Sequence, residues 1–208
     1  VCAGRTDSGV HARGQVVSFS LSEEELACRS EFKLLRSLNA LTHEDISVKS
    51  VRRQASDFSA RFSCTMREYK YFICTDAYKP LLMKGFCWHI PKELDLEAMR
   101  AAAACLIGEH DFKSFCMAAS AEGKSTMRNV FSIDVSREDA WGENLVVITV
   151  KGNAFLHSMV RTIVGTLVAV GLGRRRPEWI AEVLEARNRA AAGENAPAQG
   201  LVFWNVSY

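Results

Sequence analysis

Residues 155–171 constrain the fold most strongly, because their apolar side chains recur with the period of an α-helix. Eight apolar positions lie on one side of such a helix: 155, 156, 159, 160, 163, 164, 167 and 168. A face this wide must be buried against other parts of the chain. The opposite stripe carries His157, Ser158, Arg161, Thr162 and Gly165. A membrane span would tolerate Arg161 poorly, so we expect a core helix whose arginine points at water or at a carboxylate.

The rest of the chain alternates between predicted strands and predicted helices. Alternating or β-branched residues predict strands at 15–21, 46–51, 67–74, 128–135, 145–150 and 202–208. Helical periodicity predicts helices at 30–41, 94–107 and 177–187, with Ser30 as an N-cap. Small residues at 193–200 predict a loop. Antiparallel strands interspersed with helices are typical of an α+β fold.

The length of 208 residues leaves room for one large domain or two small ones. We expect two sheet-and-helix halves, an N-terminal one at 1–56 and a C-terminal one at 57–208. The first half is short of predicted elements, and the chain begins Val-Cys-Ala-Gly without a methionine. We therefore expect the N-terminal half to be incomplete.

Composition and charge exclude several classes of protein. Hydrophobic residues make up 48% of the chain and charged residues 24%, a globular balance in which disorder does not dominate. The formal net charge is only +2, so the chain is not a general polycation. Basic residues gather around Arg61, Arg67 and Lys70, and again between 151 and 189. Such clusters can meet a polyanion or be a solvated face, and charge alone leaves both open.

The seven cysteines are an odd number without C-x-x-C spacing, which favours reduced thiols in the cytoplasm over a disulfide scaffold or a zinc site. The sequence also lacks a G-x-G-x-x-G fingerprint, a P-loop and clustered metal ligands. We therefore expect a cytoplasmic protein that uses no cofactor and no metal.

The stretch Gly-Arg-Thr-Asp-Ser-Gly-Val-His-Ala at 4–12 is the strongest candidate for chemistry. A glycine-flanked aspartate is usually a turn residue, because it caps its own backbone and glycine adopts positive φ. Here Arg5 lies two residues before Asp7, and His11 lies four residues after it. A carboxylate beside cationic groups stays ionised, as a nucleophile or general base must.

Several motifs in series resemble those of the TruA family of tRNA pseudouridine synthases. They are the stretch 4–12, Phe58-Ser-Ala-Arg-Phe-Ser with Arg67-Glu-Tyr-Lys-Tyr, His110-Asp-Phe-Lys-Ser-Phe, the segment 155–165 and Ala196-Pro-Ala-Gln-Gly-Leu. The resemblance covers essentially the whole chain in the family's order. It implies the pseudouridine synthase fold, with two RRM-like or ferredoxin-like halves and the active cleft between them. It also implies that a first strand and helix ahead of the aspartate loop are absent here.

The resemblance further implies an isomerase that converts uridine to pseudouridine in the tRNA anticodon stem-loop, at positions 38–40. The reaction breaks the C1′–N1 bond, turns the base and joins it through C5. It neither oxidises nor hydrolyses, which fits the absence of a cofactor signature. By resemblance the partners are tRNA and a second copy of the chain, with no DNA and no membrane.

The matched motifs imply roles for five residues. Asp7 is the catalytic carboxylate, and Arg161 holds it. Tyr69 stacks on the target uracil, Arg5 contacts phosphate or fills the gap left by the flipped nucleotide, and Leu201 forms a pocket wall. From the residues alone, spacing favours a half-buried strand tyrosine at Tyr69, and only the motif match reverses this interpretation. A backbone-capping role for Arg5 and a core role for Leu201 stay open.

Two other functions stay open on the sequence. One is a catalytically idle RNA-binding module that keeps the fold, against which the presence of Asp7, Tyr69 and Arg161 argues. The other is a pseudouridine synthase with a different RNA target, because the chemistry residues do not distinguish substrates.

Overall fold

The computed structural model describes residues 1–117 and 123–208, and within them the chain forms two compact units. The smaller unit consists of Val1–Ala3 and Val16–Ser63, and the larger of Gly4–Gln15 and Cys64–Tyr208. The loop that carries Asp7 therefore packs with the C-terminal part of the chain. The division into domains at 1–56 and 57–208 stays a prediction, because compactness does not test which parts fold independently.

In the described residues the larger unit is built on a mixed sheet of seven strands. The order along the sheet is β1, β7, β2, β6, β5 and β4, and β3 pairs with β2 beside this path. The strands are β1 (His11–Ala12), β2 (Met66–Cys74), β3 (Trp88–His89), β4 (Gly108–Asp111), β5 (Met127–Ala140), β6 (Glu143–Gly152) and β7 (Leu201–Ser207). The pairs β1–β7 and β2–β3 are parallel, and the others are antiparallel. The expected α+β class is confirmed.

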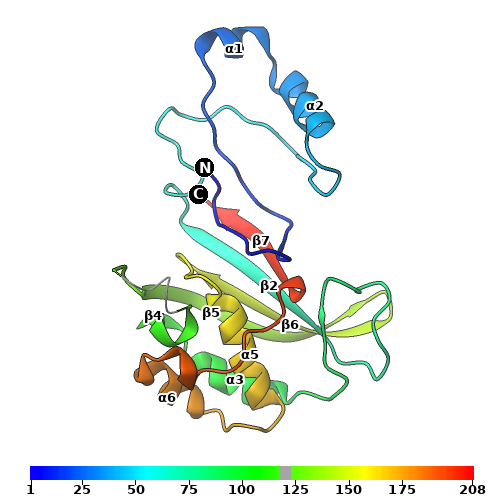
Figure 1. The fold of residues 1–208 in the computed structure, drawn as a ribbon, viewed down its shortest axis with the longest axis vertical. Helices are drawn as coiled ribbons and strands as arrows, with labels where there is room; N and C mark the ends of the chain where they lie inside the picture. Colours follow the sequence, from blue (N-terminus) through cyan, green and yellow to red (C-terminus); the bar gives the residue numbers. More distant parts are fainter. Residues whose placement is uncertain (118–122) are drawn as a thin grey trace. The chain divides into compact units, whose positions relative to one another are not determined.

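Helices of the larger unit gather on one face of this sheet (Figure 1). In the described residues they are α3 (Leu96–Ala104), α5 (Met159–Gly171) and α6 (Trp179–Ala186), with the short 3-10 turns Phe112–Phe115, Arg189–Ala191 and Ala198–Gly200. The apolar face of α5 is buried as predicted, and so are Thr162, Gly165 and Thr166 on the opposite stripe. These three residues are buried because the segment 193–196 covers this side of α5. The helix begins at Met159, four residues later than the pattern predicts.

The opposite face of the sheet carries a second, smaller apolar cluster. Phe72 and Cys74 alternate along β2 with Tyr71 and Ile73, so their side chains point to the other face. The cluster consists of Phe72, Cys74, Cys87, Leu145, Val147 and Val202, with Met83, Ala140 and Trp204 packed against it. The segment between β2 and β3 therefore folds over this face.

The Glu143 side chain anchors that segment. Its carboxylate accepts hydrogen bonds from the backbone amides of Leu81, Leu82 and Met83, at 2.6, 2.8 and 2.9 Å. Desolvation of Glu143 raises its pKa, but the amide hydrogen bonds lower it by more, so the pKa lies below its ordinary value. The ionised form of Glu143 is thus the one that holds the segment in place.

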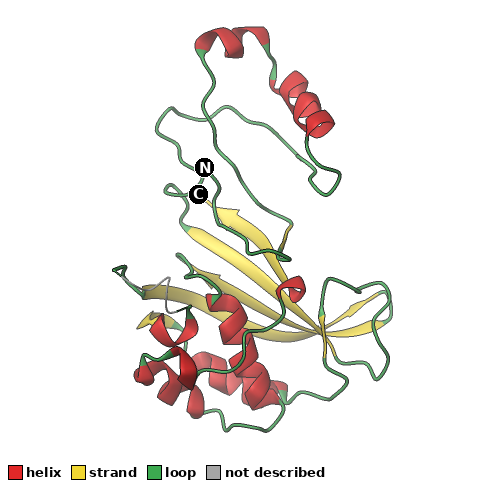
Figure 2. Cartoon of the chain, in the orientation of Figure 1, coloured by secondary structure: helices red, strands yellow, loops and turns green. Residues whose placement is uncertain are grey.

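The smaller unit contains two helices in the described residues, α1 (Glu23–Cys28) and α2 (Glu31–Leu41). Ser30 caps α2 as predicted, because its hydroxyl accepts a hydrogen bond from the Lys33 amide at 3.3 Å. The predicted strands at 15–21 and 46–51 are wrong. Residues 15–21 contribute only an isolated bridge between Val17 and Cys2, and residues 42–65 contain no helix or strand (Figure 2).

The predicted strand pair at 128–135 and 145–150 exists but is longer than expected. β5 and β6 extend through most of 136–144, and they turn tightly at Trp141 and Gly142, with φ of 55° and 86°. Positive φ at both central residues is the geometry of a type I′ hairpin turn, which matches the twist of the strands. The polar residues on either side of this turn are therefore strand residues. Arg137, Glu138, Asp139 and Asn144 are exposed, whereas Glu143 binds the segment between β2 and β3.

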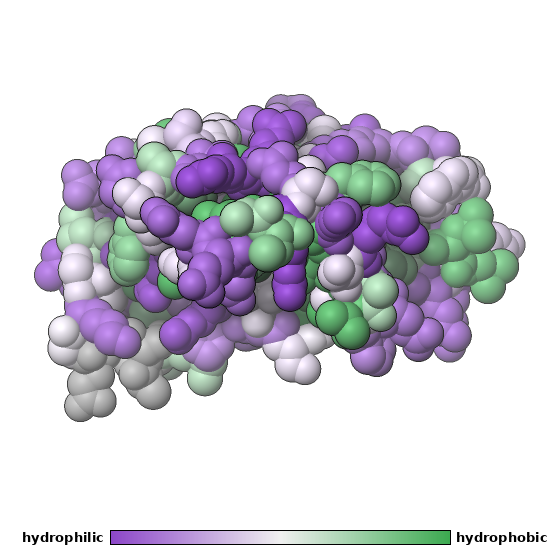
Figure 3. All heavy atoms as spheres, turned by 90° about the horizontal axis from the view of Figure 1, so that it is seen from above, coloured by the Kyte–Doolittle hydropathy of each residue, from purple (hydrophilic) through white to green (hydrophobic). Residues whose placement is uncertain are grey.

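Within residues 1–117 and 123–208, no helix is long and apolar enough to span a membrane. α5 is buried along most of its 13 residues, so the expectation of a core helix is confirmed. The face drawn in Figure 3 is mostly hydrophilic, and its apolar side chains form separate small groups. Arg67 does not belong to a cationic surface cluster as the sequence suggested, because it is buried and donates to the Asn153 carbonyl at 2.6 Å.

Candidate active site

The loop from Gly4 to Gln15 is closed by its own hydrogen bonds. The Gln15 side chain donates to the Gly4 carbonyl at 2.7 Å and accepts from the Gly4 amide at 3.4 Å. The Val10 amide donates to the Asp7 carbonyl at 3.0 Å, and Gly9 in this turn has a φ of 79°. Positive φ at the third residue is what a type II turn requires. The backbone of Asp7 is thus in a turn, and its side chain is free to point elsewhere.

Pairing with the last strand fixes this loop to the sheet edge. His11 and Ala12 pair with Val202 and Phe203 of β7, and the Arg13 amide donates to the Phe203 carbonyl at 2.9 Å. The His11 ring lies 2.8 Å from the Gly85 carbonyl through Nε2 and stacks on Phe86. The contacts of His11 therefore secure the loop and do not reach Asp7.

Gly4 brings the loop down onto two aromatic rings of the sheet. A Cβ at this position would lie 2.9 Å from Cε2 of Phe203 and 3.3 Å from the hydroxyl oxygen of Tyr69. The Tyr69 ring in turn meets Phe203 and Phe155 edge-on, with centroids 5.0 and 5.1 Å apart. Only 7% of Tyr69 is exposed, so the ring lies directly under the aspartate loop.

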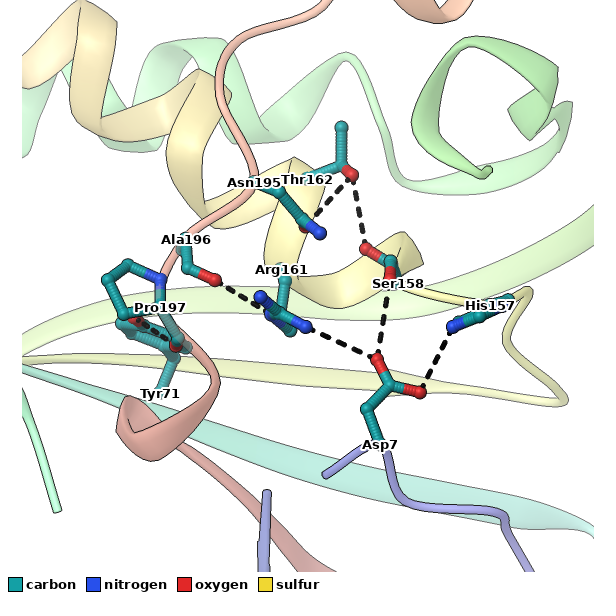
Figure 4. Close-up of polar contacts among 9 residues, drawn as sticks. All are labelled: Asp7, Tyr71, His157, Ser158, Arg161, Thr162, Asn195, Ala196 and Pro197. Carbon is teal, nitrogen blue, oxygen red and sulfur yellow. Dashed lines mark hydrogen bonds and ion pairs between the residues drawn. The ribbon is translucent and has the colours of Figure 1, made fainter. Parts of the chain in front are cut away.

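The Asp7 carboxylate faces the first turn of α5 (Figure 4). Its Oδ2 receives hydrogen bonds from Nη1 of Arg161 and from Oγ of Ser158, both at 3.3 Å. Its Oδ1 lies 3.3 Å from Nε2 of His157. The side chains of Asp7 and Arg161 are 29% and 17% exposed, so this ion pair is half-buried. The positive end of the α5 dipole adds to the attraction.

Arg161 is itself held from the other side by the segment before β7. Its Nε donates to the Ala196 carbonyl at 2.7 Å, and the Ala196 amide donates to the Arg161 carbonyl at 3.2 Å. Gly165, one turn further along α5, makes this approach possible, because a methyl group there would overlap the Glu194 carbonyl oxygen. The Tyr71 hydroxyl donates to the Pro197 carbonyl at 2.8 Å. Burial raises the pKa of Tyr71, which keeps this hydroxyl a hydrogen-bond donor.

Comparison with known proteins decides the family. Residues 102–208 match the family model described as tRNA pseudouridine synthase. The tRNA pseudouridine synthase A of Pectobacterium atrosepticum is 42% identical over 208 residues, covering 100% of this chain and 70% of that protein. The chain belongs to the TruA family of tRNA pseudouridine synthases. The Salmonella arizonae and Bacillus subtilis proteins of the same name are 44% and 40% identical, covering all of this chain and 73% and 81% of their own lengths.

Membership in the family establishes the reaction class. The chain is an isomerase that acts on uridines of tRNA, and its mixed sheet with helices on one face fits the pseudouridine synthase fold. In the described residues, no three or more His, Cys, Asp or Glu side chains are arranged to hold a metal ion.

The structure brings some of the expected site residues together and leaves others apart. Asp7 and Arg161 are in direct contact. Tyr69 lies under the loop that carries Asp7, because Gly4 of this loop packs closely against the Tyr69 hydroxyl. Leu201 pairs with Tyr71 at the start of β7 and is 6% exposed. Arg5 is exposed and makes no hydrogen bond or ion pair with residues 1–117 or 123–208.

Two further side chains reach Asp7, and the sequence did not single them out. On sequence grounds, His157 and Ser158 are only members of the polar stripe. Both precede α5 by one or two residues and contact the carboxylate. The sequence could have indicated both residues, because they lie on the same helical stripe as Arg161, whose side chain is expected to point at water or at a carboxylate.

Proposed function

We propose that this enzyme isomerises uridines of the tRNA anticodon stem-loop, at positions 38–40, with Asp7 as the catalytic residue. The observation that carries the proposal is the contact between Asp7 and Arg161, which lie 154 residues apart in sequence. A half-buried ion pair contributes little to stability once desolvation is counted. A fold that nevertheless brings the two together on a partly exposed carboxylate is organised for chemistry.

The chemistry asks little of the protein beyond this carboxylate. The C1′–N1 bond breaks, C5 takes the place of N1 on the ribose, C5 loses its proton and N1 gains one. A carboxylate beside the ribose can act as nucleophile or as base in such a sequence. Arg161 fixes its orientation, and Ala196 fixes Arg161 in turn. The base is read outside its stack, as enzymes acting on nucleobases require.

Tyr69, Leu201 and Arg5 complete the proposed site. Arg5 is exposed beside Asp7 in sequence, where it can contact phosphate or occupy the place of a flipped nucleotide. Leu201 and Tyr69 lie on the paired strands β7 and β2. Because only 7% of Tyr69 is exposed, stacking of its ring on uracil requires the Gly4–Val10 turn or Phe155 to shift when RNA binds.

We further propose that the enzyme works in the cytoplasm as a homodimer that binds tRNA across both subunits. The motif resemblance supports this assignment. Size-exclusion chromatography with light scattering measures the mass in solution, and a monomer at working concentration would contradict the dimer.

The decisive experiment is turnover on unmodified tRNA, with pseudouridine mapped by carbodiimide labelling. The wild-type chain should modify the anticodon stem-loop, and Asp7→Asn should reduce modification to background while tRNA binding is retained. Asp45→Asn is a matched control, because Asp45 also pairs with a histidine, His43, at 3.2 Å but lies in the smaller unit.

The outcomes separate the parts of the proposal. Modification outside the anticodon stem-loop contradicts the substrate assignment. Unchanged turnover in Asp7→Asn contradicts the catalytic role. Binding without turnover in the wild-type chain would instead identify an RNA-binding module.

A further inference from the structure

Ser158 has an unusual backbone conformation immediately before α5. Its φ and ψ are 61° and 7°, in the left-handed region, which side chains other than glycine, asparagine and aspartate rarely adopt. A serine before a helix ordinarily caps it through its hydroxyl, but the Ser158 side chain makes no capping hydrogen bond. The conformation therefore has another reason than starting the helix.

The left-handed turn directs the hydroxyl of Ser158 to the active site. Its Oγ donates to Oδ2 of Asp7 at 3.3 Å. The backbone still serves the helix, because the Ser158 carbonyl accepts from the amide and the hydroxyl of Thr162, at 3.0 and 3.1 Å. The Ser158 side chain therefore does not cap the helix and instead donates to the Asp7 carboxylate (Figure 4).

His157 supplies the matching contact on the other carboxylate oxygen. Its Nε2 lies 3.3 Å from Oδ1 of Asp7, and its side chain is 48% exposed. Its carbonyl accepts from the Met117 amide at 3.4 Å, which fixes the backbone from which the ring extends. Oδ2 thus has two hydrogen-bond donors, Ser158 and Arg161, and Oδ1 has one ion-pair contact, with His157.

This distribution defines the orientation of the carboxylate. A carboxylate presents about four lone-pair sites, two on each oxygen. The two donors on Oδ2 occupy its sites, whereas Oδ1 keeps one beside the His157 contact. Contacts on both oxygens also hinder rotation about the Cβ–Cγ bond, which Arg161 alone would permit.

We infer that His157 and Ser158 are positioning residues of the isomerase, which hold Asp7 so that Oδ1 is the oxygen presented to the substrate. The inference rests on the proposed catalytic role of Asp7. His157 and Ser158 set the rate of the chemical step and leave tRNA affinity to other parts of the surface. A misplacement of about 1 Å in a reacting group can lower the rate about 100-fold.

The test compares variants that separate the donor from the backbone. Ser158→Gly keeps the left-handed conformation and removes the hydroxyl, and Ser158→Asn keeps both a tolerant backbone and a donor. His157→Phe removes the ring nitrogen that contacts Oδ1 and keeps a ring, whereas His157→Gln places an amide nitrogen near the position of Nε2. His43→Phe is the control, because His43 pairs with Asp45 in the smaller unit.

Single-turnover rates and tRNA dissociation constants of the full chain give the answer. We expect Ser158→Gly and His157→Phe to lower the single-turnover rate about 10-fold to 100-fold, with an unchanged dissociation constant and an unchanged or higher Tm for Ser158→Gly. Ser158→Asn and His157→Gln should recover part of the rate. The double variant should lose less than the product of the single losses, because both residues act on one carboxylate.

The controls distinguish this inference from the proposed function. If Asp7→Asn is inactive while Ser158→Gly and His157→Phe turn over like the wild type, the positioning role is refuted and the catalytic role stands. A wild-type chain without turnover, or an active Asp7→Asn, refutes the proposed function itself. A rate loss in His43→Phe equal to that in His157→Phe refutes a role specific to Asp7.

Discussion

Gly165→Ala tests whether the close approach of the segment 193–196 to α5 is what positions Arg161. A methyl group at Gly165 would overlap the Glu194 carbonyl oxygen and lie 2.9 Å from the Glu194 carbonyl carbon. These are backbone atoms, which cannot rotate aside as a side chain can. The segment must therefore move away from the helix, and the Ala196 carbonyl moves with it.

The expected loss of stability follows from the contacts that this movement breaks. Four hydrogen bonds join the segment to α5. They run from Arg161 to the Ala196 carbonyl, from the Ala196 amide to the Arg161 carbonyl, from the Thr162 hydroxyl to the Asn195 side chain, and from the Gly193 amide to Thr166. Each contributes about 0.5–1.5 kcal/mol. Replacing glycine by alanine inside a helix stabilises the helix by about 1 kcal/mol, which offsets part of this loss. The free energy of unfolding should therefore fall by about 3 kcal/mol.

Urea denaturation measures the stability change, and turnover on tRNA measures the effect on the site. We expect Gly165→Ala to lower turnover at least about tenfold, because Arg161 loses the partner that orients its guanidinium. Gly171→Ala is the control on the same helix, since its methyl group meets the flexible Met99 thioether, with Sδ at 2.6 Å. Wild-type stability and turnover in Gly165→Ala would refute the argument, as would equal losses of turnover in both variants.

Two further predictions concern groups with shifted pKa values. Because the pKa of Glu143 is lowered in the folded state, its stabilising effect is present above the ordinary pKa and is lost as pH falls through the folded pKa. The stability difference between the wild type and Glu143→Gln, from urea denaturation at several pH values, should thus vanish in acid, and a pH-independent difference would contradict this. Burial raises the pKa of Cys87 to about 11, so iodoacetamide at about pH 8 should label exposed Cys28 and Cys105 but not Cys87. Equal labelling rates would show that Cys87 is accessible.

The sequence predicts those elements best whose pattern is local and whose faces are unambiguous. β2 follows the predicted 67–74 within one residue, because charged and aromatic side chains alternate along it. The strand predictions at 15–21 and 46–51 fail although their residues are β-branched. Val17 and Phe19 are 59% and 55% exposed, which shows that β-propensity without a partner strand and a buried face does not make a strand.

The candidate site was predictable only in part, for a related reason. Asp7, Tyr69 and Arg161 could be named because their motifs resemble those of a known family. The geometry of these residues depends on glycines that are required because a residue distant in sequence packs against them. Phe203 packs against Gly4, and Glu194 packs against Gly165. A single sequence shows that a glycine is present and does not show which backbone approaches it.

The first four residues of the predicted helix at 155–171 are not helical, and two of them contact Asp7. Phe155 and Leu156 continue the apolar period, so the helix is expected to include them. In the structure Phe155 instead packs edge-on against Tyr69, and Ser158 turns left-handed before α5 begins. A strained residue persists only when its surroundings determine it, and here the determinants are Thr162 on the backbone side and Asp7 on the side-chain side. The departure from the helical pattern therefore has a structural reason. It is the place where the chain gives up a helical turn to put His157 and Ser158 on the carboxylate.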